Sequence, residues 1–199
     1  MFPGGLGATA QGEMIKDNVV EVGLWLHPKG YEEQAVYKQD LKQYQIGRED
    51  SLLIPPNGYA MVEGFHSFDH PVRIDSFQPH GHLRMNAASL EVFYPETGIT
   101  EPISQISNWS ATWHHSHIYD PDVAPLLPAG AILVLKQWYD NTSNNPNVTD
   151  SDQFVVWGSR TGDEMNHAWI AVTHLDQEGY EKLLKARSEK EQRSIVGDG

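Results

Sequence analysis

The chain has no cysteine among its 199 residues. Disulfide bonds, iron–sulfur clusters and thiolate metal sites are therefore excluded. Any metal ion would have to be bound by histidine, methionine, carboxylate or backbone ligands. The lack of cysteine does not by itself identify the redox compartment in which the protein works.

Long apolar runs and positive charge are also scarce. No apolar run approaches the roughly 20 residues that span a bilayer, so we expect no membrane insertion. Lys and Arg total 14 against 27 Asp and Glu, which gives a net charge of −13. This charge disfavours a nucleic-acid partner and an anionic membrane surface.

An export signal is not evident at the start of the chain. Residues Met1 to Gly5 have neither the basic nor the apolar segment of a signal peptide. The compartment therefore stays unknown: the protein is cytoplasmic, or its export signal lies elsewhere.

The residues that are present describe a globular protein rich in short strands. Hydrophobic residues make up 39% and charged residues 21% of the chain, and its length suits one domain. Strands are predicted at 19–26, 51–54, 59–68, 72–83, 89–94, 99–106, 109–119, 131–139, 154–157 and 165–174, and 31–50 is predicted to be a loop or a short irregular strand. Turn signals such as Pro95-Glu96-Thr97-Gly98 separate the strands. Many short strands and almost no helix predict an all-β protein with one antiparallel β-sandwich.

The chain has no internal repeat and no interdomain linker. We expect a flexible lead-in at 1–17, one β-sandwich domain at 18–175, and a charged tail at 176–199 that forms a short helix or frays. Four tryptophans are expected in the core: Trp25, Trp113, Trp138 and Trp157.

A histidine pair dominates the middle of the chain. His80 and His82 lie within the segment Gln78 to Met85. On an extended strand they are about 6.6 Å apart and point to the same face. Two such imidazoles can reach one zinc, copper, iron or nickel ion. A chain with ten histidines can also contain this triplet by chance.

A third ligand would decide between several kinds of metal site. A cupin would have a glutamate three or four residues after His82, but Met85 and Asn86 occupy those positions. A soft ligand is available further along, because the thioether of Met165 is a good ligand for Cu(I) and a poor one for zinc.

A zinc site would instead take a third histidine from a neighbouring strand. The candidates are His115 and His117, which share a face of the strand predicted at 109–119, or His66. His114 is expected to face the opposite side from His115, so this histidine-rich segment is predicted to be a polar, solvent-facing edge.

Several motifs, taken together, carry a resemblance to a known family. They are Phe77-Gln78-Pro79-His80-Gly81-His82-Leu83-Arg84, Leu127-Pro128-Ala129-Gly130, Trp138-Tyr139-Asp140-Asn141, Asn145-Pro146 and Gly158-Ser159-Arg160-Thr161-Gly162-Asp163-Glu164-Met165. The combination resembles the copper type II, ascorbate-dependent monooxygenases. More narrowly, it is similar to their C-terminal domain, as in bacterial relatives of peptidylglycine α-hydroxylating monooxygenase and dopamine β-monooxygenase. The similarity runs from about residue 19 to about residue 180.

The resemblance implies a fold, a cofactor and a reaction. The fold would be a jelly-roll β-sandwich holding one copper ion through His80, His82 and Met165. The domain would be the O₂-activating half of the enzyme, hydroxylating a substrate C–H through a copper–superoxo species with ascorbate or another reductant. O₂ and an unknown organic substrate would be its partners. The family also suggests a periplasmic or secreted location.

The sequence departs from the peptide-hydroxylating members in its substrate residues. Those members have an arginine for the substrate carboxylate two residues before the first histidine, where this chain has Gln78. An amide cannot form a charged bidentate pair, so a glycine-ended peptide is not the expected substrate. The pocket is expected to include Gln78, His167 and Trp169. Arg84 is expected to face outward or to brace the sheet.

The chain also lacks the separate domain that carries the family's electron-transfer copper. Turnover would therefore need a partner copper domain. Two alternatives remain open: a copper-binding or interaction module without turnover, and a zinc site that uses His115 or His117.

Overall fold

The computed structural model describes residues 19, 21–26, 28–30, 38–45 and 52–197. The chain divides into two units, residues 1–35 and 36–199. The lead-in predicted at 1–17 lies outside the described residues, as do 31–37 and 46–51.

The first unit does not contain the predicted strand at 19–26. The described residues of this segment have no regular secondary structure, and the side chain of Trp25 is 93% exposed, so the prediction that it belongs to the core is wrong. Alternating apolar residues show only that one face could be buried. A strand also needs a neighbour for its backbone hydrogen bonds, and none of the described strands pairs with these residues.

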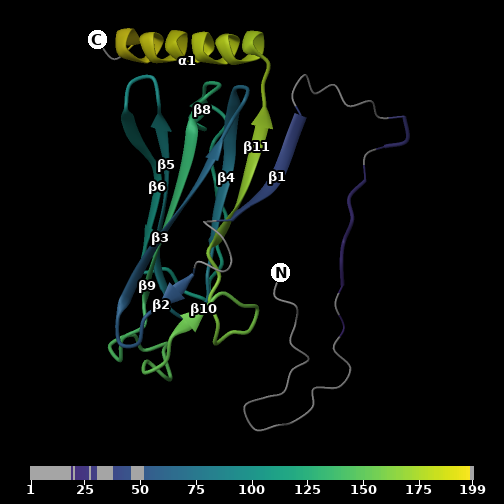
Figure 1. The fold of residues 1–199 in the computed structure, drawn as a ribbon. Helices are drawn as coiled ribbons and strands as arrows, with labels where there is room; N and C mark the ends of the chain where they lie inside the picture. Colours follow the sequence, from purple (N-terminus) through teal and green to yellow (C-terminus); the bar gives the residue numbers. More distant parts are fainter. Residues whose placement is uncertain (1–18, 20, 27, 31–37, 46–51, 198–199) are drawn as a thin grey trace. The chain divides into compact units, whose positions relative to one another are not determined.

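The second unit contains two antiparallel sheets and a C-terminal helix (Figure 1). The elements are β1 (Lys38–Gln45), β2 (Leu53–Ile54), β3 (Tyr59–Ser67), β4 (Val72–His80), β5 (Met85–Tyr94), β6 (Ile99–Ser107), β7 (His117–Ile118), β8 (Leu126–Leu127), β9 (Ile132–Asp140), β10 (Val155–Val156), β11 (His167–His174) and α1 (Gln177–Gly197). One sheet has the order β1-β11-β4-β7, with β8 also on β4, and the other has the order β3-β9-β5-β6. Strands β2 and β10 form a small separate ladder.

The pairing is that of a jelly roll. The first long strand pairs with the last (β1 with β11), and β3 pairs with β9. Strand β4 pairs with β7 and β8, and β5 pairs with β6. These antiparallel pairs are nested, as in a long hairpin wound into two sheets. The prediction of an antiparallel jelly-roll sandwich is confirmed.

Both sheets bury alternate side chains in one hydrophobic core. Phe77 and Ile170 come from one sheet, and Leu90 and Leu135 come from the other. Full burial of such a side chain contributes about 2 kcal/mol. Trp157 packs against this core, as predicted.

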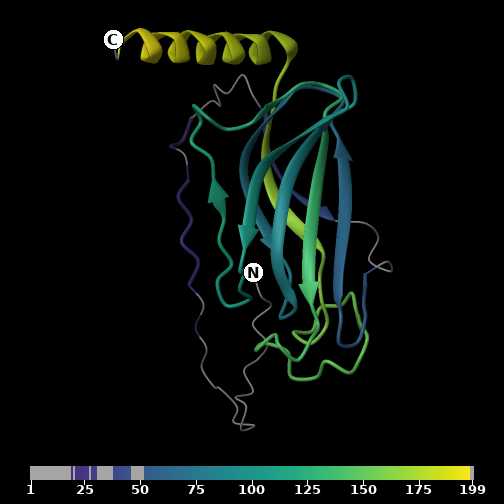
Figure 2. The same cartoon turned by 90° about the vertical axis from the view of Figure 1, so that its left-hand side faces the viewer.

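Helix α1 confirms the prediction of a helical tail. It begins after Asp176, whose Oδ1 accepts a hydrogen bond from the backbone N–H of Gly179 at 2.7 Å, the pattern of an N-cap. The helix lies across one end of the strands in both views (Figures 1 and 2). Among the described residues, no helix is long and apolar enough to cross a membrane.

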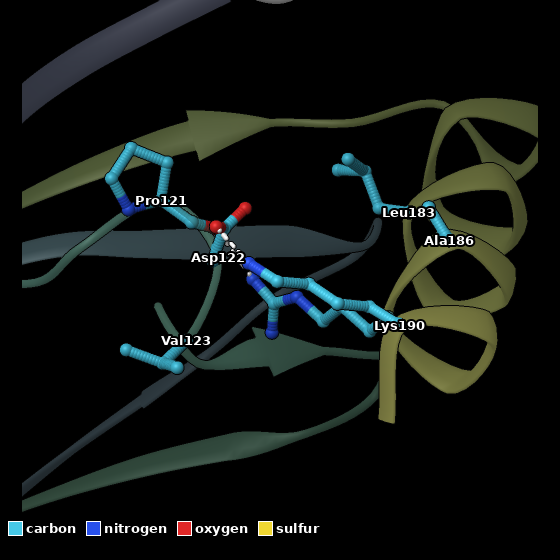
Figure 3. A pocket seen from close by; sticks show the side chains of 7 residues that line it. Pro121, Asp122, Val123, Leu183, Ala186 and Lys190 are labelled. Atoms are coloured by element: carbon cyan, nitrogen blue, oxygen red, sulfur yellow. Dashed lines mark hydrogen bonds and ion pairs between the residues drawn. The ribbon is translucent and has the colours of Figure 1, made fainter. Parts of the chain in front are cut away.

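A polar contact joins α1 to the segment before β8 (Figure 3). Lys190 forms an ion pair with Asp122, and Nη2 of Arg187 donates to the carbonyl of Pro121 at 3.0 Å. A cavity of about 430 Å³ lies between the helix and residues 121–123. The residues around it are mostly exposed, so this is an attachment point for the helix rather than a second core.

The strand predicted at 109–119 is the main correction within the sandwich. Only β7 forms, and residues 108–116 make turns and irregular loop. Asn108 has a φ of 55°, which breaks the extended chain at the end of β6. Trp113 consequently lies on the loop and is 73% exposed rather than buried in the core.

Candidate metal site

The predicted site residues meet where β4 ends and β11 begins. In the antiparallel register, His80 lies opposite His167, and Gln78 lies opposite Trp169. The residues that alternate with these four along the two strands are buried in the core. The four side chains therefore occupy the other face of the sheet. The structure thus brings together the three predicted pocket residues and the first histidine of the pair.

Three imidazole rings surround His80. The ring centroids of His82, His114 and His167 lie 5.4, 5.0 and 4.6 Å from that of His80. His82 and His114 meet it edge to face at 88° and 73°, whereas His167 stacks on it at 24°. Sequence reasoning missed His114, because its position depends on the loop at 108–116 rather than on a strand.

Burial keeps His80 and His167 neutral. Burial, followed by the neighbouring charges of His167, His114 and His82, lowers the pKa of His80 to about 3. Burial and His82 lower the pKa of His167 to about 4. Neutral imidazoles have a lone pair available at pH 7, as a metal ligand requires.

His82 has its ring oriented by a distant segment. Its Nδ1 lies 2.9 Å from the carbonyl oxygen of Asp163. A carbonyl can only accept, so Nδ1 carries the proton and Nε2 carries the lone pair. Such a hydrogen bond to the second nitrogen is the usual way in which a histidine ligand is fixed in its metal-binding tautomer.

Glu164 joins the turn after β4 to the segment before β11. Its fully buried carboxylate accepts hydrogen bonds from the backbone N–H groups of His82 at 2.6 Å and Arg84 at 2.5 Å. Burial raises the pKa of Glu164 to about 7, against the opposing effect of these N–H donors and the Arg84 charge. Residues 82–84 and 163–165 therefore lie side by side.

Met165 is placed by the same contacts. Met165 and His82 are each two residues beyond the last pair of the β4–β11 ladder. The hydroxyl of Tyr139 donates to the carbonyl of Met165 at 2.8 Å, and the side chain is half-buried. Strand β11 begins two residues later than predicted, so Met165 lies on the loop that leads into it.

Arg84 is buried beside the site and holds the surrounding loops together. It is buried, and its guanidinium donates to Oδ1 of Asn141 at 2.7 Å and to the carbonyls of Gly162 and Asp150 at 3.0 and 3.2 Å. Arg84 was expected either to face outward or to brace the sheet, and the structure shows a buried, bracing side chain, bonded to the surrounding loops.

Gly81, between the two histidines, leaves room for a neighbouring side chain. A Cβ at this position would lie 2.6 Å from Sδ and 2.7 Å from Cβ of Met85. The side chain of Gln137 fixes the same region, because its Nε2 donates to the carbonyl of His80 at 2.8 Å and to Sδ of Met85. The backbone at the histidine pair is therefore closely packed from the inside.

The alternative third histidines lie elsewhere. His115 and His117 contact each other, with ring centroids 5.1 Å apart, and Trp113 stacks on His115. His66 belongs to β3 in the other sheet. No three His, Asp or Glu side chains in the described part of the chain are already arranged to hold a metal ion. In the described part of the chain, the structure does not form the predicted zinc site with His66, His115 or His117 as the third histidine.

Comparisons with known proteins do not identify a family. No protein-family model matches the sequence, and no curated protein matches it. Solved structures similar to the chain include one of the infectious bursal disease virus Gx strain, at 9% identity and a TM-score of 0.33, over 80% of this chain and 38% of that one. Another is the VP2 subviral particle of the same virus, at 13% identity and a TM-score of 0.32, over 86% and 41%. The chain thus spans less than half of these viral chains, and at such TM-scores the jelly-roll assignment depends on the strand order alone.

Proposed function

We propose that this domain binds one copper ion through His80, His82 and Met165. The observation that carries the proposal is the orientation of His82, whose Nδ1 donates to Asp163 and so presents Nε2 as a ligand. Two imidazoles and a thioether make a donor set that suits Cu(I).

We further propose that the domain is the O₂-side half of an ascorbate-dependent copper monooxygenase. Bound copper would supply one-electron redox chemistry with O₂ as the oxidant. Hydroxylation of a C–H bond consumes one O₂, two electrons and two protons, and it releases one water. The electrons would come from ascorbate or another reductant through a partner copper domain.

The face beside the histidine pair would hold the organic substrate. Gln78 offers an amide, Trp169 offers an indole that is 37% exposed, and His167 is neutral. None of these side chains carries a positive charge that could bind a carboxylate of the substrate. The substrate is therefore proposed to be a neutral molecule, held by hydrogen bonds to Gln78 and by contact with the ring of Trp169.

A copper-binding module without turnover is the second candidate. The observation that favours it is the separation of His114 from His115, which lie in different ring clusters. The adjacent pair therefore does not form an electron-transfer copper site of the family's kind on this chain. Such a module would bind copper and deliver or store it.

Metal binding by the whole chain tests the proposal. We expect one Cu(I) per chain by competition with bicinchoninate, at least tenfold weaker binding in Met165→Ile, and loss of the copper–sulfur signal in the X-ray absorption spectrum of that variant. His82→Ala should abolish tight binding. The proposal would be overturned by tight zinc binding without a copper preference, or by a Met165→Ile variant whose Cu(I) affinity is unchanged.

Oxygen uptake tests whether the domain turns over. Uptake with ascorbate that His82→Ala abolishes would indicate a monooxygenase, and no uptake by the copper-loaded protein would indicate a copper-binding module.

A further inference from the structure

The loop at 108–116 places a third imidazole against the histidine pair. Its first residues are fixed by the hydrogen bond from the N–H of Trp109 to the carbonyl of Asn86 at 2.9 Å. The buried Trp109 ring packs on His114 with centroids 5.2 Å apart. His114 in turn lies edge to face on His80. The loop therefore holds His114 over the candidate site.

The spacing of these rings suits a shared metal ion. An imidazole nitrogen lies about 2.0 Å from its ion and the ring centroid about 1.1 Å further, so two rings on one ion have centroids roughly 4.4–5.4 Å apart for ligand angles between about 90° and 120°. The His80–His114 and His80–His82 separations are 5.0 and 5.4 Å. Both pairs of rings can therefore share an ion with only small movements.

The ring angles distinguish His114 from His167. A ligand nitrogen directs its lone pair in the plane of the ring. The planes of His80 and His114 cross steeply at 73°, so both can contain one nearby ion. The rings of His80 and His167 are stacked at 24°, so their planes do not meet within ligand distance. His114 is the better placed of the two as a ligand.

The three histidines are not yet arranged around one point. Completing the arrangement needs a change in the ring torsion of His114, which has a broad intrinsic energy well, together with an adjustment of its contact with Trp109.

We propose that His114 is a third imidazole ligand of the copper ion and that it binds the Cu(II) state. This inference depends on the proposed copper site and changes its ligand set from two histidines and a methionine to three histidines and a methionine. Cu(II) favours tetragonal coordination with more nitrogen and oxygen ligands, whereas Cu(I) is satisfied by the other three ligands. The loop at 108–116 would thus favour the oxidised ion.

Adjacent histidines provide a matched test. His114→Ala and His114→Phe remove the nitrogen, and the phenylalanine keeps a ring against Trp109. His115→Ala is the control, because His115 contacts Trp113 and His117 instead. The readouts are the number of imidazoles coupled to Cu(II) in pulsed EPR, Cu(II) affinity by competition with nitrilotriacetate, and Cu(I) affinity by competition with bicinchoninate.

We expect three imidazoles in the wild type and in His115→Ala, and two in both His114 variants. Cu(II) affinity should fall about 10- to 100-fold in the His114 variants, and Cu(I) affinity should change less than about threefold. Two imidazoles in every protein would overturn this inference while leaving the copper site intact. Copper binding that His82→Ala does not affect would instead overturn the proposed site itself.

Discussion

His80 and His167 lie directly opposite each other on β4 and β11, with their rings stacked at 4.6 Å and 24°. Their positions follow from the ladder register, since a cross-strand pair shares one face of the sheet. The stack makes His167 a support for the ring of His80. The rigid sheet thereby orients one of the proposed copper ligands.

Removing His167 should weaken copper binding without removing a ligand. In His167→Ala, the His80 ring loses its stacking partner, and we expect about tenfold weaker Cu(I) binding, as for other groups that orient ligands. His174→Ala, at the other end of β11, is the matched control and should bind copper normally. A lower number of imidazoles on Cu(II) in His167→Ala would show that His167 is a ligand after all.

A methyl group at Gly81 should disturb both the fold and the site. In Gly81→Ala the new Cβ would overlap the side chain of Met85, and overpacking of this kind costs about 1–3 kcal/mol. We expect a lower free energy of unfolding in urea and at least tenfold weaker copper binding. Gly162→Ala is the control, because nothing lies within 4 Å of a Cβ there. Equal stability of the two variants would contradict the packing described for the histidine pair.

Replacing Glu164 by glutamine should loosen the turn that carries His82. The carboxylate accepts from two backbone N–H groups, whereas a glutamine amide would direct its NH₂ group at one of them. An unsatisfied buried donor costs about 1–3 kcal/mol. At about pH 8.5, above the Glu164 pKa of about 7, urea unfolding should show a loss of about 2 kcal/mol in Glu164→Gln and almost none in Glu96→Gln, which lies on an exposed turn. If stability is unchanged, the carboxylate does not hold the two segments together.

The contact between α1 and Asp122 should depend on pH and salt. The hydrogen bond and charge of Lys190 lower the pKa of the Asp122 carboxyl below its ordinary value of 3.8. A lowered folded pKa stabilises the contact above pH 3.8, and this stabilisation is lost as the pH falls through the folded value. Because both groups are exposed, salt should weaken the contact.

An NMR titration of the Val123 and Ala186 amides measures this effect. In the wild type, the midpoint should lie below 3.8. In Lys190→Gln or at 1 M NaCl, it should rise toward 3.8. Lys185→Gln is the control, since Lys185 pairs with Glu189 on the same helix. A wild-type midpoint at or above 3.8 would rule out the ion pair in solution.

Sequence periodicity predicted the long strands β3, β4, β9 and β11, although their partners are distant in the chain. The hairpin of β5 and β6 was predicted from Pro95 to Gly98, and Gly98 has the positive φ of 70° that the turn requires. The same alternation failed at 19–26, because periodicity reports which face could be buried and not whether a neighbouring strand exists.

The sequence by itself determined the class of fold and the shared face of His167 and Trp169, because these follow from the local period of a strand. It also determined the proximity of His80 and His82, because only one residue separates them, although β4 ends at His80. The copper assignment stays a prediction from motifs. Only the tertiary structure decided which distant groups surround the pair. Glu164 reaches His82 across 82 residues, and His114 reaches His80 from an irregular loop. Such contacts depend on strand order and loop conformation, which no local pattern encodes.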